Sequence, residues 1–342
     1  MRSLFSRQIS VLQAESETES NATIEGRCRV KILVTGGTGA VGRFVCRELV
    51  ACGQEPVIAS RHAPTESPEA AAWVEWDMAR ESALDVMREH QVTRVIHLAA
   101  VVGAAGDADV PETIRVNGST TADLLASARQ AGVERVVMMS SKGVYGDIPL
   151  RSSRDDGFDE SDLRNSPLSA YGISKAVAEW ACDAAAHTYK QDVVYIRAAS
   201  TVGPGKGVQH GPTATPSRMV ESAFAGEDVV IDQGGDVLDD FVYNKDLARG
   251  LVTACLWPKP LPSLGYHIST GAGVTLKELG SYLQARFPRV RLAIGDGYNF
   301  HGRDHNLHGV LSYARARRDF GYEPAFPFPR WVDDYVAELA RR

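Results

Sequence analysis

Short apolar runs alternate with amphipathic segments between residues 29 and 200. Six runs have the length and composition of buried strands: RVKILVTGG, EPVIASR, AWVEWD, VTRVIHLAAVV, VERVVMMSS and DVVYIRAAS. Three longer segments between them have helical spacing: AVGRFVCRELVACG, PETIRVNGSTTADLLASARQAG and LSAYGISKAVAEWACDAAAHTYK. Strands that alternate with helices predict parallel βαβ units, so we expect an α/β fold with a doubly wound parallel sheet over residues 29–200.

The alternation is less regular after residue 200. The segment TVGPGKGVQHGPTATP is typical of a long loop, and later segments predict helices at 216–226, 244–257 and 275–287 and strands at 228–232 and 266–269. We expect residues 201–342 to form mainly a smaller α/β substrate lobe that covers the sheet edge, with some segments returning to the core. Residues 1–28 are polar and lack the apolar stretch of a secretory signal, so we expect an extra, disordered tail.

Composition excludes several classes of function. The chain has 342 residues, 44% of them hydrophobic, and a formal net charge of -6, which gives no electrostatic reason to bind nucleic acid or an anionic membrane. No apolar stretch is long enough to span a bilayer. The five scattered cysteines form no Cys-x-x-Cys pair, which favours reduced thiols in a cytoplasmic protein. The nine histidines show no metal-ligand spacing, so we expect no metal.

A glycine-rich turn joins the first predicted strand to the first predicted helix. In VTGGTGAVGR, Gly36, Gly39 and Gly42 have the spacing G-x-x-G-x-x-G. Such glycines allow a tight turn, a close approach of backbone to a pyrophosphate and close packing of the helix on the strand. The helix N-terminus then offers free N–H groups to phosphates. The strand–turn–helix context makes this turn a strong candidate for a dinucleotide site.

The second predicted strand indicates which dinucleotide is bound. An acidic residue usually ends this strand and bonds the ribose hydroxyls of NAD, whereas here the strand ends with Ser60 and Arg61. An arginine at this place favours NADP over NAD, because it can pair with a 2′-phosphate, and Arg43 is placed to assist. Asp77, after the third strand, is placed to meet the adenine amino group.

Tyr171 and Lys175 lie four residues apart in a predicted helix, so they share one face. A lysine ammonium beside a phenol lowers the pKa of the tyrosine. The pair is therefore either an acid–base device or an ordinary helix surface, and the spacing alone does not decide between them.

Seven motifs, in order, cover residues 30 to 325: TGGTGAVG, HLAA, RVNGSTTADLLASARQAGVERVVMMSS, SSKGVYG, YGISK, RAASTVGPG and DDFVYNKDLARG. Together they resemble the extended short-chain dehydrogenase/reductase family, also called NAD-dependent epimerase/dehydratases. The resemblance implies a Rossmann-type fold. It also implies that Tyr171 is the general acid/base, that Lys175 lowers its pKa and bonds the nicotinamide ribose, and that Ser141 bonds the reacting oxygen.

The resemblance also implies the ligand-binding positions. The expected cofactor-binding residues are Gly36, Gly39, Ala40, Val41, Gly42, Ser60, Arg61, Asp77, Met78, Leu98, Ala99, Ala100, Asn117, Tyr171, Lys175, Ala198 and Ser200. The expected substrate-binding residues are Ser141, Lys142, Gly143, Tyr171, Lys206, His210 and Arg303. Members often form homodimers through the helices that here contain TTADLLASARQ and KAVAEWACDAAAH, so we expect a homodimer.

The departures from the family pattern bear on the reaction. Dehydratases place an Asp-Glu pair after the catalytic Ser, where this chain has Lys142 and Gly143. Asp239 replaces an arginine that meets the phosphate side of nucleotide sugars, and a carboxylate there would repel a diphosphate. Three hypotheses remain: a dehydrogenase/reductase acting on a secondary hydroxyl or ketone of a sugar or similar molecule, an epimerase of sugars or nucleotide sugars that keeps its NAD bound, and a non-catalytic NAD(P)-binding sensor or scaffold.

Overall fold

The computed structural model describes residues 29–65, 71–102, 108–149, 157–206, 208–300 and 305–341. The predicted tail, residues 1–28, lies outside these ranges. No helix in the described ranges is long and apolar enough to cross a membrane.

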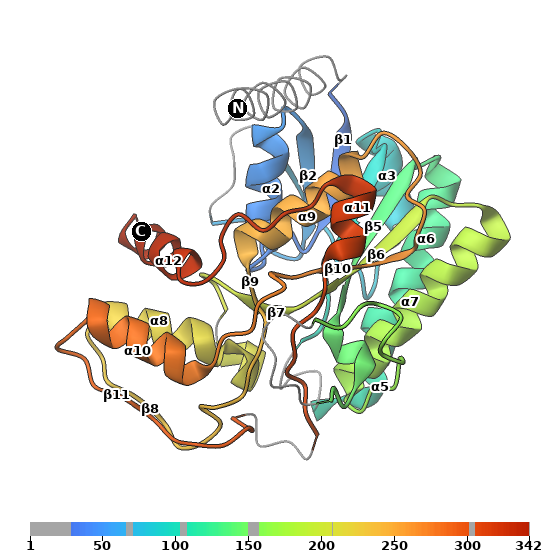
Figure 1. Ribbon diagram of the computed structural model, residues 1–342. Helices are drawn as coiled ribbons and strands as arrows, with labels where there is room; N and C mark the ends of the chain where they lie inside the picture. The colour runs from blue at the N-terminus through green and yellow to red at the C-terminus, as the bar shows by residue number, and fades with distance from the viewer. Residues whose placement is uncertain are drawn as a thin grey trace, which may run out of the picture.

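Seven parallel strands form the central sheet of the described chain, in the order β10-β6-β5-β4-β1-β2-β3 (Figure 1). Their bounds are β1 Lys31–Thr35, β2 Glu55–Ser60, β3 Ala72–Glu75, β4 Arg94–His97, β5 Arg135–Ser141, β6 Val193–Ala198 and β10 Gly265–Ile268. β1 lies inside the sheet, between β4 and β2, and is fully buried over Ile32, Leu33 and Val34. This arrangement confirms the predicted doubly wound sheet, whose parallel strands all end at one edge.

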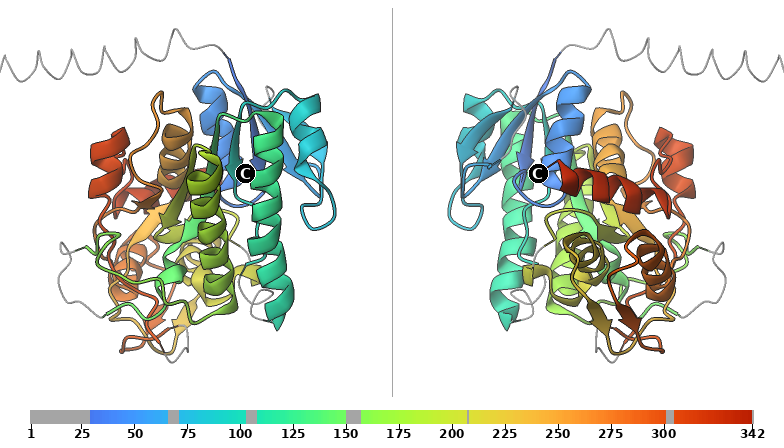
Figure 2. Two further views of the ribbon diagram at one scale, coloured as in Figure 1. Left: turned by 90° about the vertical axis from the view of Figure 1, so that its right-hand side faces the viewer. Right: turned by 90° about the vertical axis from the view of Figure 1, so that its left-hand side faces the viewer.

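Helices cover both faces of this sheet. α2 (Gly42–Ala51) and α9 (Asn244–Leu256) pack together on one face, while α3 (Ala83–Glu89), α6 (Thr120–Ala131) and α7 (Ala170–Tyr189) cover the other. Figure 2 shows α6 and α7 side by side on this second face. The predicted helix over 111–132 contains a wider turn, because a π-helix, Arg115–Ser119, joins α5 (Val110–Ile114) to α6.

A second group of elements extends from the carboxyl edge of the sheet (Figure 1). Its helices are α8 Thr215–Ala225, α10 Leu276–Arg286 and α12 Arg330–Ala340, and its paired strands are β8 Val229–Ile231 with β11 Leu292–Ile294 and β7 Ser200–Val202 with β9 Phe241–Tyr243. A separate hydrophobic cluster holds these elements together, with Phe241, Trp331 and Tyr335 fully buried at its centre.

The structure corrects two assignments made from the sequence. The strand expected at 266–269 was placed in the smaller lobe, but as β10 it pairs with β6 in the central sheet, Tyr266 beside Ile196. The helix α3 was not predicted at all; Ser82 caps it by accepting a hydrogen bond from Leu84 N at 3.2 Å. Short helix α11 (Ala314–Phe320) then packs beside β10.

Candidate active site

The glycine turn lies where β1 meets α2, and its backbone is closed against the neighbouring strand. Gly36 has φ +68°, and a Cβ there would lie 2.8 Å from the backbone nitrogen of Ala99. A Cβ on Gly42 would lie 2.2 Å from the carbonyl oxygen of Gly36. Thr35 Oγ1 accepts hydrogen bonds from the N–H groups of Leu98 and Ala99, both at 3.2 Å. The turn therefore requires glycine at both positions and has a fixed place beside the end of β4.

A cavity of about 870 Å³ runs along the carboxyl edge of the sheet. Most of the nominated residues border it: Gly36, Gly39, Ala40, Val41, Gly42, Ser60, Arg61, Asp77, Met78, Leu98, Ala99, Ala100, Ser141, Lys142, Gly143, Tyr171, Ala198, Ser200, Lys206 and His210. Ligands of doubly wound sheets bind at this edge. The fold thus gathers segments from many parts of the chain, between the end of β1 and the smaller lobe, around one cavity.

Ser141 and Tyr171 border the cavity together. Ser141 is the last residue of β5, and its Oγ accepts a hydrogen bond from Gly143 N at 3.0 Å. Tyr171 lies in the first turn of α7, which Ser169 caps by accepting from Gly172 N at 3.0 Å. A Cβ on Gly172 would lie 2.4 Å from the carbonyl oxygen of Gly143, so glycine lets this helix end approach the serine segment.

Lys175 lies behind the phenol and does not border the cavity. Its Nζ donates to the carbonyl oxygen of Met139 at 2.8 Å and lies 5.8 Å from the centroid of the Tyr171 ring. Burial lowers the pKa of Lys175 to about 8, against the opposing effects of Cys182 and Glu179. The helix spacing therefore places the two side chains on one face, as the sequence predicted.

The pKa of Tyr171 differs from the expected direction. Burial raises it to about 12, and a hydrogen bond with Ser141 offsets part of the rise. The expected lowering by Lys175 does not appear in this state, in which burial and the Ser141 hydrogen bond set the pKa of the phenol. The phenol is consequently protonated at neutral pH and is a proton donor in this state.

Asn117 does not border the cavity, although it was nominated as a cofactor-binding residue. Its side chain is buried, accepts from Val101 N at 2.7 Å and donates to Val101 O at 2.9 Å and to Ser174 Oγ at 3.0 Å. Asn117 therefore fixes the backbone after β4 against α7.

The two arginines nominated for a 2′-phosphate lie differently. Arg61 is exposed at the mouth of the cavity, at the end of β2. Arg43 donates to the carbonyl oxygen of Pro204, and its Cζ lies over the Phe44 ring, 5.2 Å from the ring centroid. Arg43 thus connects α2 to the loop that carries Lys206. Arg303 lies outside the described residues.

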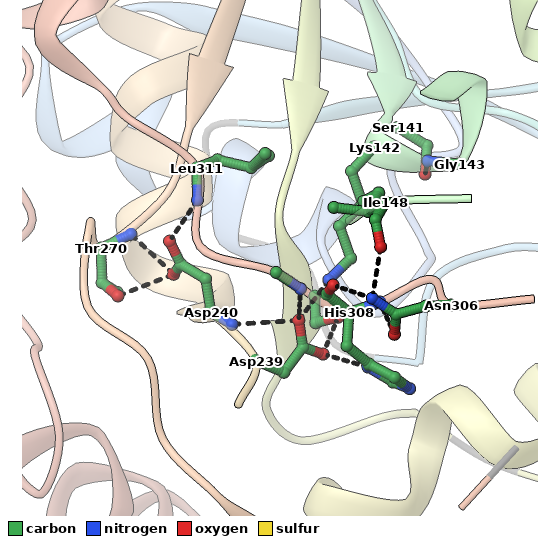
Figure 3. A network of polar contacts seen from close by, with 12 residues as sticks. Ser141, Lys142, Gly143, Ile148, Asp239, Asp240, Thr270, Asn306, His308 and Leu311 are labelled. Atoms are coloured by element: carbon green, nitrogen blue, oxygen red, sulfur yellow. Dashed lines mark hydrogen bonds and ion pairs between the residues drawn. The ribbon is translucent and has the colours of Figure 1, made fainter. Parts of the chain in front are cut away.

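A polar network that the sequence did not predict borders the cavity next to Ser141 (Figure 3). Asp239, 1% exposed, pairs with Lys142 Nζ and accepts from His308 Nδ1 at 2.9 Å and from Ser200 Oγ at 2.6 Å. Gly309 N donates to the same carboxylate at 3.3 Å. Burial alone would raise the pKa of Asp239, but Lys142 and His308 hold it well below its usual range.

This network corrects the expectation that Asp239 repels a diphosphate. The carboxylate is buried and its charge is compensated by Lys142, so it presents no free negative charge to a ligand. Its neighbour Asp240 has a different role: it accepts from Thr270 N at 2.9 Å and Gly271 N at 3.1 Å, and burial raises its pKa to about 6. Asp240 holds the loop after β10 to the substrate lobe (Figure 3).

Comparison with known proteins places these features in a family. The model of the NAD dependent epimerase/dehydratase family matches residues 32–264. The UDP-glucose 4-epimerase of Azospirillum brasilense is 29% identical over 277 residues, covering 73% of this chain and 72% of that protein. Other curated relatives and solved neighbours include a reductase and a dehydratase.

Two solved structures have the same fold. The UDP-glucose 4-epimerase of Thermotoga maritima, solved with UDP-glucose, has a TM-score of 0.80 and 23% identity over 91% of this chain and 99% of that one. MoeE5, solved in complex with UDP-glucose and NAD, has a TM-score of 0.76 and 27% identity over the same shares of the two chains.

Proposed function

The chain belongs to the NAD dependent epimerase/dehydratase family, and we propose that it is an NAD-dependent epimerase that transiently oxidises one hydroxyl-bearing carbon of a nucleotide sugar. One observation carries the proposal: Ser141 and Tyr171 border the same cavity as the glycine turn. A proton-transferring pair and a phosphate cradle around one space are the parts that reversible hydride transfer needs.

The residues present fit a dinucleotide. The closed glycine turn leaves no room for a Cβ at Gly36 or Gly42, as expected where phosphates meet backbone N–H groups. Ser60 and Asp77, at the ends of β2 and β3, would hold the adenosine end. Lys175 would reach the nicotinamide ribose after a side-chain rotation, because its ammonium is bonded to the Met139 carbonyl. NAD, when bound, supplies the hydride acceptor and donor.

Tyr171 moves the proton in this proposal. Its phenol must first give its own proton to water. The resulting phenolate takes the proton of the substrate hydroxyl while hydride leaves the same carbon, and the phenol so formed returns that proton when hydride comes back to the opposite face. Ser141 donates to the reacting oxygen, and the N–H of Gly143 holds the Ser141 hydroxyl in place at 3.0 Å. The keto sugar must turn over between the two transfers, which the size of the cavity supports.

Lys142 and Gly143 argue against a dehydratase. Elimination of water requires an acid and a base beside the serine, whereas the Lys142 ammonium is paired with Asp239 and Gly143 has no side chain. The second candidate is a reductase with net NADP turnover, which the position of Arg61 at the cavity favours. We propose NAD for this chain because the 27% identical solved relative holds NAD.

Proton NMR of UDP-sugars tests the proposal. Purified protein is incubated with UDP-glucose, and separately with UDP-glucuronic acid, with catalytic amounts of NAD. An epimerase converts at least one of them to its epimer with no net change in absorbance at 340 nm. In a separate incubation with NADPH and a ketosugar, a stoichiometric loss of NADPH would instead establish the reductase. No reaction in either incubation would contradict both the epimerase and the reductase.

We also propose a homodimer formed through α6 and α7. Trp180 is 59% exposed and Ile173 36% exposed on α7, seven residues apart and thus on one helix face. Large exposed apolar side chains on one face are typical of an interface. Sedimentation equilibrium should show a dimer that Trp180→Glu weakens; a monomeric wild-type protein would contradict the assignment.

A further inference from the structure

Two buried lysines and the carboxylate of Asp239 lie at the proposed substrate end of the cavity. Lys142 and Lys206 are each 7% exposed, and Asp239 is 1% exposed. Both lysines border the cavity, as do Ser141 and Tyr171. Lys142 directly follows Ser141 in the chain, so this wall faces the reacting end of a ligand rather than the adenosine end of the cofactor.

The contacts of Asp239 and Lys206 show how the charges are distributed. Asp239 is bound by Lys142, His308, Ser200 and the backbone of Gly309. Lys206 Nζ instead donates to two carbonyl oxygens, Thr201 O at 2.8 Å and Thr213 O at 3.2 Å. Two of its three N–H bonds are used in this way, and no ion pair joins Lys206 to an acid in the described part of the chain.

A buried ammonium without a counterion is unstable. Burial lowers the pKa of Lys206 to about 7, and Lys142 lowers it further while Asp239 opposes. The position is nevertheless built for the amine, because two carbonyls accept from it and hold it at the cavity wall. An anionic group of a ligand would complete the site by pairing with Lys206, as Asp239 pairs with Lys142.

We propose that Lys206, with Lys142 beside it, selects a substrate whose sugar carries a carboxylate, so that the substrate is a uronic acid or its nucleotide derivative. The inference rests on the proposed function for one premise, that the sugar reacts beside Ser141 and Tyr171. The diphosphate of a nucleotide sugar lies away from the reacting carbon, so the anion that meets this wall belongs to the sugar itself. A carboxylate accepts charge-assisted hydrogen bonds from both ammonium groups.

Calorimetric titration of the purified full chain with matched ligands tests the proposal. The pairs are UDP-glucuronic acid against UDP-glucose, and D-glucuronic acid against D-glucose. In the pair that binds, the acid should bind at least about tenfold more tightly, as hydrogen bonds between charged groups provide. Equal affinity within a pair, or no binding of either acid, would overturn the proposal.

Variants of Lys206 assign the preference to this side chain. Lys206→Gln should abolish the preference for the acid while leaving the affinity for the neutral sugar within about threefold. Lys206→Arg should retain the preference, and Lys259→Gln, at an exposed position, is the matched control. A Lys206→Gln protein that weakens both ligands equally would show that Lys206 only holds the loop, and would overturn the proposal.

Binding and turnover separate this inference from the proposed function. A protein that binds the acid tightly but neither epimerises nor oxidises it would refute the proposed function and retain the carboxylate site. A protein that epimerises UDP-glucose and UDP-glucuronic acid with equal kcat/KM would retain the proposed function and refute the site.

Discussion

The two ends of the cavity are built differently. At the proposed cofactor end, the glycine turn after β1 has its shape set by backbone contacts such as Gly36 against Ala99. The proposed substrate end carries charged side chains: Lys142, Lys206 and Asp239 are all buried. Figure 3 shows Lys142 and Asp239 paired there. Under the proposed function, backbone contacts shape the glycine turn for the phosphates of the cofactor, while buried charges at the other end would distinguish substrates.

The largest expected effect tests whether the two ends act on one reaction. Tyr171→Phe removes the proton carrier but keeps the ring, so turnover should fall about a thousandfold with NAD binding unchanged. Steady-state epimerisation and calorimetric NAD titration measure the two quantities. Activity within a few-fold of the wild-type protein would remove Tyr171 from the mechanism.

The next effect concerns the stability of the substrate end. Asp239→Asn leaves the buried Lys142 ammonium without its counterion, which should lower the free energy of unfolding by about 3 kcal/mol. Urea denaturation at pH 7 measures the change. Because the paired carboxylate has a lowered pKa, the wild-type contribution is present at neutral pH and is lost only in strong acid. A loss below about 0.5 kcal/mol would show that the pair is not coupled.

Gly42→Ala tests the backbone-built end. The new Cβ would lie 2.2 Å from the Gly36 carbonyl and 2.6 Å from Gly37 Cα, so the turn must open at a cost of about 2 kcal/mol. NAD affinity should fall by about thirtyfold. Gly53→Ala is the control, since it has a positive φ but open space around it, and it should lower stability without changing NAD affinity. Unchanged NAD affinity in Gly42→Ala would remove the turn from the cofactor site.

A pH series sharpens the role of Lys206. Since its pKa is about 7 and only the ammonium attracts an anion, affinity for the acidic sugar should fall about tenfold per pH unit above pH 7, until the pH reaches the higher pKa of the complex. Lys142, His210 and His308 also border this part of the cavity, and Asp239 is bonded to Lys142 and His308. Lys206→Gln retains all four groups and is the control, so its affinity for the acidic sugar should not change with pH. A parallel slope in Lys206→Gln would assign the pH dependence to those groups.

The smallest expected effect concerns Arg61. If NAD is the cofactor, Arg61→Ala should change NADH affinity by less than about threefold, because an exposed arginine without a 2′-phosphate partner contributes little. Fluorescence titration with NADH and NADPH measures both affinities. Tighter binding of NADPH by the wild-type protein, lost in Arg61→Ala, would restore the NADP preference that the sequence favoured.

The sequence was sufficient for six of the seven strands of the central sheet and for the positions that border the cavity beside the glycine turn. Strand runs such as the one before Gly36 and the G-x-x-G-x-x-G spacing are local patterns, and local patterns fix parallel βαβ units. β10 was misplaced because a four-residue strand reveals nothing about its partner, and Tyr266 pairs with Ile196, seventy residues earlier. Lys142 and Asp239 were each noticed, but their ion pair joins positions 97 residues apart and depends on the packing of two lobes.

The pKa of Tyr171 is a further quantity that spacing alone did not give. The four-residue spacing placed Lys175 beside the ring correctly, at 5.8 Å from its centroid. The pKa of the phenol depends on how much water the fold excludes, and burial is the largest influence on it here. Side-chain neighbours along a helix are therefore predictable, whereas their electrostatic consequence requires the surrounding structure.

The dinucleotide released from gently purified protein tests the central claim, that this cavity holds NAD beside Tyr171 for a closed cycle of hydride transfer. The protein is passed through gel filtration and denatured, and the released cofactor is identified and quantified by mass spectrometry. The account predicts stoichiometric NAD that survives gel filtration. Protein that emerges empty and then binds NADPH more tightly than NADH would contradict it and establish an exchanging reductase.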